Sequence, residues 1–159
     1  MNIAIGSDHR GVTAKGQLIS QLRSNGHQVT DLGTDSEKST DYPQHAGPCA
    51  RLVSEGRVDR GILMCGTGIG CSIVANKFRA VRAAVCHDEL TAEMSRRHND
   101  ANVLCLGADL LGNEMMRRIV ELWLATEFEG GRHARRIDKI TAMETAHLQY
   151  ENLRCRNGT

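Results

Sequence analysis

Apolar residues recur along this chain in two different patterns. Five short apolar runs of strand length lie at 2–6, 27–33, 60–66, 82–87 and 102–107. A turn signal follows each run, which is typical of a strand that leads into a loop. The segments after the runs show helical spacing instead, and they predict helices at about 11–25, 43–57, 70–79, 88–98, 111–127 and 132–150.

The alternation of strands and helices predicts the fold class. Strands joined by helices form βαβ units, so the sheet is parallel and helices cover both of its faces. We therefore expect an α/β fold with a doubly wound five-stranded parallel sheet in three layers, α/β/α. Its second strand is short and only partly apolar. The length of 159 residues fits one domain, expected over 1–150, with a polar tail over 151–159.

Composition and charge argue against several classes of protein. A net charge of +1 and an aromatic content of 3% give no support for binding nucleic acid or a membrane surface. The N-terminus is charged too early for a signal peptide, and no stretch approaches the roughly 20 apolar residues of a membrane span. The six cysteines have no CxxC spacing, which favours reduced, buried thiols, no metal site and a cytoplasmic protein.

Polar and reactive groups concentrate where the predicted strands end. Ligands of open parallel sheets bind at the carboxyl ends of the strands. The segments that follow the five strands are 7–10, 33–43, 65–70, 86–89 and 107–109. We therefore look for the site in these loops.

Three glycines, Gly66, Gly68 and Gly70, follow the third strand and open a helix in the stretch LMCGTGIGCS. They are compatible with a tight strand-to-helix turn. They are also compatible with a dinucleotide phosphate loop, although the spacing is GxGxG, and Asp88 lies 22 residues after Gly66, where a ribose-binding acid would lie. A third interpretation is an oxyanion hole made of backbone N–H groups.

Cys65 ends the third strand directly before these glycines. A cysteine at such a position is either a small core residue or a thiolate stabilised by the helix N-terminus and the row of N–H donors. A thiolate beside an oxyanion hole can act as a base or a nucleophile. Cys71, one helical turn further on, is either a packing residue or a second thiol.

Two histidines also lie in candidate positions. Asp8 and His9 follow the first strand, where they form a helix cap or bind hydroxyls or an anion. His98 and Asn99 end the fourth helix, where they act as a cation with an Asn cap or as a proton donor facing the pocket.

Arg132 and Arg136 lie four residues apart in the first turns of the last helix, after Gly130 and Gly131. Residues at this spacing share a helix face. Because positive charge in a first turn opposes the helix dipole, the pair favours an anionic partner such as phosphate.

Six motifs in the same order carry a family resemblance. They are GSDHRG near the start, TDYP at 40–43, CGTGIG at 65–70, ANKF at 75–78, RRHNDANV at 96–103 and EGGRHARRI at 129–137. Together they resemble the type B ribose-5-phosphate isomerases, which share a family with the galactose-6-phosphate isomerase subunits. The resemblance covers roughly 1–147.

The resemblance implies a cofactor-free aldose–ketose isomerase with a Rossmann-like sheet. It also implies a small-molecule sugar phosphate as substrate and a homodimer, or a dimer of dimers, with the active site at the interface. Cys65 matches the base that moves a proton between C1 and C2, through a cis-enediolate. His98 matches the acid that helps to open the furanose ring. The backbone N–H groups from Gly66 to Gly70, with the Thr67 hydroxyl, match the hole that holds the enediolate.

The remaining site residues follow from the same motifs. The sugar contacts match Asp8, Asn99 and the loop with Asp41 and Tyr42, and the phosphate contacts match His9, Arg132 and Arg136. The catalytic set implied by the resemblance is Cys65, His98, Thr67, Asp8 and Asp41. The substrate-binding set is His9, Tyr42, Gly66, Gly68, Ile69, Gly70, Asn99, Arg132 and Arg136, and no metal ligand is implied.

Two positions depart from the family's pattern. Asp109 lies where many members carry an arginine that contacts phosphate, and a carboxylate there repels phosphate unless a cation intervenes. Cys71 lies where one branch of the family carries an acidic base, with Cys65 replaced. In this chain both positions are cysteines, and Cys65 is the expected base.

Two other functions remain compatible with the sequence. One is isomerisation of a different sugar phosphate, of the allose, galactose or tetrose type, because the chemistry is confined to C1 and C2. The other is a non-catalytic Rossmann module that binds a nucleotide or phosphate, for which the cysteine and the histidines would have no role.

Overall fold

The computed structural model describes residues 1–156, with side chains up to residue 147 and at Tyr150. Five strands form one sheet: β1 (Asn2–Ser7), β2 (Gln28–Asp31), β3 (Arg60–Cys65), β4 (Ala83–Val85) and β5 (Val103–Gly107). The helices are α1 (Val12–Ser24), α2 (Pro43–Ser54), α3 (Ile69–Ala75), α4 (Glu89–Asn99), α5 (Asn113–Ala125) and α6 (Arg132–Arg156). A short 3-10 helix, η1 (His9–Gly11), precedes α1.

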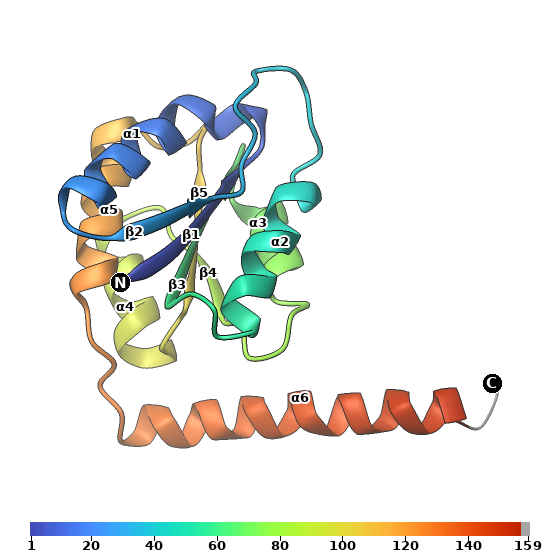
Figure 1. The fold of residues 1–159 in the computed structure, drawn as a ribbon. Helices are drawn as coiled ribbons and strands as arrows, with labels where there is room; N and C mark the ends of the chain where they lie inside the picture. The colour runs from blue at the N-terminus through green and yellow to red at the C-terminus, as the bar shows by residue number, and fades with distance from the viewer. Residues whose placement is uncertain (157–159) are drawn as a thin grey trace. The chain divides into compact units, whose positions relative to one another are not determined.

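The sheet is parallel throughout and has the order β2-β1-β3-β5-β4. This confirms the predicted doubly wound α/β fold. Because β1 and β5 both pair with β3, the loops after β1 and β5 lie on either side of the loop after β3 (Figure 1). That arrangement brings three of the candidate loops to one edge of the sheet.

Alternate residues of the central strands face two separate apolar clusters, as the period of two requires. Ile62 and Met64 of β3 pack in the cluster that includes α1, α4 and α5. Leu63 and Cys65 pack in the cluster that includes α2 and α3. The helices therefore cover both faces of the sheet, which gives the predicted three layers (Figure 1). Cys65 points toward the α2 and α3 side.

Several elements differ in extent from the prediction. β4 is only three residues long, and α3 spans seven residues and begins at Ile69. η1 was not predicted; it forms because the Asp8 carboxylate accepts the Arg10 N–H and caps the turn. α6 continues to Arg156 instead of ending near residue 150, so part of the expected tail is helical. The rest of that tail, 157–159, lies outside the described residues.

The chain divides into two compact units, the first spanning Met1–Phe128 and the second beginning at Glu129. The first unit contains the whole sheet and the helices from α1 to α5, and the second contains α6. The expectation of a single domain over 1–150 stays a prediction. None of the helices in the described part of the chain is both long and apolar enough to cross a bilayer.

Candidate active site

The backbone ties the ends of the three central strands together. The Asp8 N–H donates to the Met64 carbonyl at 3.3 Å, and the Ala108 N–H donates to the Cys65 carbonyl at 2.9 Å. One residue further along, the Asp109 N–H donates to the Gly66 carbonyl at 3.0 Å. The loops after β1, β3 and β5 therefore form one continuous surface around Cys65.

Cys65 is buried with 5% of its surface exposed, yet its pKa is lowered from 9.0 to about 6. A hydrogen bond from the Cys71 thiol is the main cause, and burial opposes it. Backbone N–H groups of Cys71, Gly68 and Thr67 also donate to the sulfur. The thiolate is therefore the favoured form of Cys65 at neutral pH.

The pKa values of four other cysteine thiols are raised rather than lowered. Burial raises the pKa of Cys49 to about 12 and also raises the pKa of Cys86 and Cys105. The pKa of Cys71 is raised, chiefly because its thiol donates to Cys65. Among the five cysteines whose side chains are described, all of them free thiols, only Cys65 combines the position and the pKa of a base. The sixth, Cys155, lies outside the described side chains.

A Cβ on any of the three glycines of the loop would meet a neighbouring group. Gly68 has a φ of +78°, and a Cβ there would approach the Leu106 backbone to 3.0 Å. A Cβ on Gly66 would meet the Asp109 carboxylate at 2.7 Å. A Cβ on Gly70 would meet the Tyr42 ring at 2.6 Å. The loop is thus packed on two sides by side chains, and its amides turn inward to the Cys65 sulfur.

The dinucleotide interpretation of the loop finds little support in this geometry. Asp88, the expected ribose-binding acid, is the N-cap of α4, where its carboxylate accepts the Thr91 N–H at 2.7 Å. The same bond lowers the pKa of Asp88.

The pKa of Cys65 leads to a prediction about alkylation. The rate at which iodoacetamide labels Cys65 is expected to rise with pH to a plateau, with its midpoint near pH 6, because only the thiolate reacts. In Cys71→Ala the midpoint moves upward, since the main hydrogen bond to the thiolate is lost. Mass spectrometry of the labelled peptide measures both midpoints, and a native midpoint near 9 would contradict the assignment.

A buried lysine holds the loop between β2 and α2 in place. The Lys15 side chain is 2% exposed, and its ammonium contacts Asp31 at 2.6 Å and Asp35 at 2.9 Å. Both hydrogen bonds raise the pKa of Lys15 against the effect of burial, so the ammonium stays charged. Lys15 thereby fixes the start of the loop that carries Asp41 and Tyr42.

The same loop fixes the orientation of His9. The Thr40 N–H donates to His9 Nδ1 at 3.2 Å, so the proton of a neutral His9 lies on Nε2. The Thr40 hydroxyl lies 3.2 Å from His45 Nε2, and His45 Nδ1 lies 3.0 Å from the Leu32 carbonyl. Tyr42, at the end of this loop, lies against Gly70. Asp41 is exposed.

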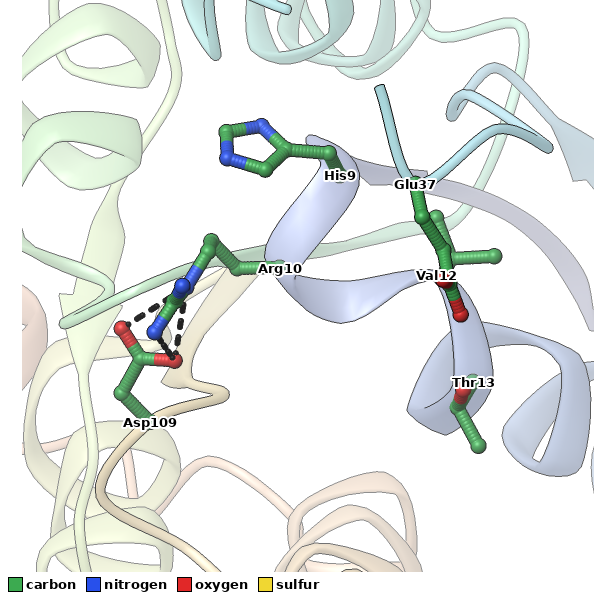
Figure 2. Close-up of a pocket in the computed structure, with 6 residues that line it drawn as sticks. All are labelled: His9, Arg10, Val12, Thr13, Glu37 and Asp109. Carbon is green, nitrogen blue, oxygen red and sulfur yellow. Dashed lines mark hydrogen bonds and ion pairs between the residues drawn. The ribbon is translucent and has the colours of Figure 1, made fainter. Parts of the chain in front are cut away.

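A cavity of about 270 Å³ opens beside η1 (Figure 2). It is lined by His9, Arg10, Val12, Thr13, Glu37 and Asp109. Within this lining Arg10 and Asp109 form an ion pair, with Nη2 and Oδ1 at 2.7 Å. Arg10 is therefore a cation that intervenes beside Asp109.

The end of α4 holds His98 and Asn99 on a rigid support. The Arg96 guanidinium is buried and donates to Asp100 Oδ1 at 2.8 Å and to the Ala101 carbonyl at 2.6 Å. Asp100 closes the helix in the left-handed conformation, with a φ of +44°. His98 is half-buried and Asn99 is exposed.

Arg132 and Arg136 belong to the second unit, in the first two turns of α6. Arg132 Nε donates to His133 Nε2 at 3.2 Å. The structure thus brings together Cys65, the glycine loop, Asp8, His9, Tyr42 and Asp109 within the first unit, while the phosphate role of the two α6 arginines stays a prediction.

Three contributors to the site were not predicted: Arg10, Lys15 and Thr40. Arg10 lies in a strand-end segment, which was a signal for a functional position, but its partner is 99 residues away in sequence. Lys15 looks like an exposed helix residue, and Thr40 acts through its backbone N–H. The roles of Lys15 and Thr40 therefore could not be predicted from the pattern of residue types.

The family model described as Ribose/Galactose Isomerase matches residues 3–140. This chain belongs to that family. Ribose-5-phosphate isomerase B of Escherichia coli K12 is 48% identical over 142 residues, covering 89% of this chain and 95% of that protein. D-erythrulose-4-phosphate isomerase of Pectobacterium atrosepticum is 42% identical over 141 residues, covering 88% and 93%.

A solved structure of Clostridium thermocellum ribose-5-phosphate isomerase B has the same fold. The TM-score is 0.90 at 47% identity, and the alignment covers 92% of this chain and 99% of that one. Membership of the Ribose/Galactose Isomerase family confirms the resemblance carried by the six motifs, and the Rossmann-like sheet is confirmed with it. The roles of single residues stay predictions.

Proposed function

We propose that this chain is an aldose–ketose isomerase that interconverts ribose 5-phosphate and ribulose 5-phosphate. The observation that carries the proposal is the Cys65 thiol, whose pKa of about 6 makes it a base at neutral pH. It lies at the carboxyl end of the central strand of a Ribose/Galactose Isomerase fold. Proton abstraction beside a carbonyl needs such a base, with a pKa close to the operating pH.

The reaction moves one proton from C2 to C1 and a second from O2 to O1. The Cys65 thiolate takes the proton from C2 of the open-chain aldose, and the bonding electrons form the cis-enediolate. The thiol then returns a proton to C1 while the proton of the O2 hydroxyl passes to O1, which gives the ketose. The Thr67 hydroxyl and the loop amides, including Gly66, Gly68, Ile69 and Gly70, stabilise the negative oxygen. Because carbon is oxidised and reduced within one molecule, the reaction requires no redox cofactor.

The remaining residues bind the substrate or prepare it. His98, at the rigid end of α4, donates the proton that opens the furanose ring, and Asn99 contacts the sugar. Asp8, Asp41 and Tyr42 complete the sugar contacts. His9, Arg132 and Arg136 bind the phosphate, whose binding energy positions C1 and C2. A homodimer, or a dimer of dimers, with its active sites at the interface, and a cytoplasmic location complete the proposal.

A second candidate is an isomerase for a shorter sugar phosphate. The Pectobacterium atrosepticum relative, 42% identical to this chain, is a D-erythrulose-4-phosphate isomerase. The proposed proton transfer between C1 and C2 is the same for a tetrose, so substrate length is decided by the residues around the phosphate. This candidate differs from the first only in substrate.

The two candidates are separated by comparing kcat/KM for three compounds: ribose 5-phosphate, erythrose 4-phosphate and unphosphorylated ribose. We expect the highest kcat/KM for ribose 5-phosphate and a much lower one for ribose. A higher kcat/KM for erythrose 4-phosphate would favour the second candidate. If a folded sample converts none of the three, and allose and galactose 6-phosphates also fail, the isomerase proposal is wrong.

A further inference from the structure

The ion pair between Arg10 and Asp109 joins two loops on either side of the Cys65 loop. Arg10 follows β1 and Asp109 follows β5, and both strands pair with β3. Arg10 Nε donates to Asp109 Oδ1 at 2.9 Å and to Oδ2 at 3.1 Å, while Nη2 lies 2.7 Å from Oδ1. Figure 2 shows the guanidinium facing the carboxylate. The pair is therefore formed through one edge of the guanidinium.

The other edge of Arg10 remains open to the cavity. Nη1 has no hydrogen-bond or ion-pair partner among the described residues, and the Arg10 side chain is 53% exposed. Asp109 raises the pKa of Arg10, so the guanidinium stays charged. An exposed ion pair of this kind contributes little to stability, so stability alone does not explain the pair.

His9 supplies a second donor to the same cavity. Its Nδ1 accepts the Thr40 N–H, which leaves the proton of the neutral ring on Nε2. Both His9 and Arg10 line the cavity of about 270 Å³. Glu37 lines it as well, and Figure 2 shows this carboxylate away from Asp109. The Arg10 donors thus lie beside Asp109 and not beside Glu37.

We propose that Arg10 binds the phosphate of the substrate through its free edge, and that Asp109 is the positioning residue that orients it. The inference rests on the proposed function for the identity of the ligand, a phosphate monoester dianion. Asp109 holds an otherwise flexible side chain in one orientation, which lowers the entropy lost on binding. A carboxylate at this position repels phosphate when it stands alone, but with Arg10 beside it Asp109 favours phosphate binding by orienting the guanidinium.

This arrangement predicts weaker phosphate binding in the single variant than in the double variant. Arg10→Ala removes a charged donor and leaves the Asp109 carboxylate unpaired next to the anion. The Kd for inorganic phosphate is expected to rise about 10- to 100-fold. In Arg10→Ala/Asp109→Ala the repelling charge is gone as well, so part of the affinity returns and the Kd is several-fold lower than in Arg10→Ala.

Isothermal titration calorimetry measures the Kd for inorganic phosphate. Steady-state kinetics on the same variants measure the KM for ribose 5-phosphate. Arg117→Ala is the matched control, because Arg117 is also an exposed, ion-paired arginine, but it lies on α5 and pairs with Glu114 and Glu121. It changes net charge equally and is expected to leave the phosphate Kd unchanged. For Arg10→Ala, KM is expected to rise by the same factor as the Kd, with kcat changing much less.

A phosphate Kd in Arg10→Ala equal to that of Arg117→Ala would overturn the inference. So would a double variant that binds phosphate no better than Arg10→Ala, because Asp109 would then have no electrostatic effect at the phosphate. The calorimetry requires no turnover. If the native chain converts no sugar phosphate but binds inorganic phosphate through Arg10, the proposed substrate is wrong and this inference stands.

Discussion

Replacing Cys65 with alanine is expected to lower kcat for ribose 5-phosphate about 10³-fold, the usual contribution of a general base. The thiolate is the group that takes the C2 proton, and its pKa of about 6 keeps it ionised at neutral pH. The Kd for inorganic phosphate is expected to stay unchanged, because the proposed phosphate contacts come from other residues. Steady-state kinetics and calorimetry on the same sample measure the two quantities.

Cys86→Ala is the control for this change. Cys86 is also a buried thiol at the end of a strand, but it belongs to the apolar cluster on the opposite face of the sheet, and its pKa is raised. Its replacement is expected to leave kcat unchanged. Retained turnover in Cys65→Ala would contradict the assignment and move the base to another group, of which Cys71 is the first to test by the same substitution.

Gly68→Ala is expected to lower kcat about 100-fold, since a displacement of the order of 1 Å at a reacting group has that effect. Gly68 has a φ of +78°, and its Cβ would lie 3.0 Å from the Leu106 backbone, which cannot move aside without shifting β5. The Gly68 N–H that donates to the Cys65 thiolate would be displaced with the loop. The free energy of unfolding is expected to fall by about 2 to 4 kcal/mol.

Gly56→Ala separates crowding from backbone strain. Gly56 also has a positive φ, +66°, but a Cβ there would meet nothing within 4 Å. The free energy of unfolding of Gly56→Ala is therefore expected to fall by about 1 kcal/mol through backbone strain alone. Its kcat is expected to stay unchanged. Urea unfolding and kinetics of both variants provide the comparison. Equal losses of stability in the two variants would show that the Leu106 contact is unimportant.

The fold could be predicted from the sequence because its signals are local and repeated. The apolar runs alternate with helical segments, and all five strands and six α-helices form where the periodicity places them. The boundaries were harder to predict, as the early end of α3 at Ala75 and the extension of α6 to Arg156 show. Helix ends depend on caps and on tertiary contacts, which periodicity does not contain.

The sequence predicted which loops form the candidate site, but it did not predict which side chains contact one another there. The position of Cys65 before a glycine loop indicated a stabilised thiolate, but the main donor, the Cys71 thiol, was expected to pack or to act as a second thiol. The pairing of Arg10 with Asp109 connects residues far apart in sequence. The partner of an arginine or an aspartate cannot be predicted from the residue type, because the order of the strands in the sheet is what brings these two loops together.

The central claim is that Cys65 transfers a proton between C2 and C1 of a sugar phosphate. Proton NMR of ribose 5-phosphate in deuterated water tests it most directly. The native chain is expected to produce ribulose 5-phosphate and to carry deuterium into the carbon skeleton, while Cys65→Ala does both about 10³-fold more slowly. Conversion by Cys65→Ala at the native rate, or a folded native chain that gives no ketose and no deuterium exchange, would contradict the account.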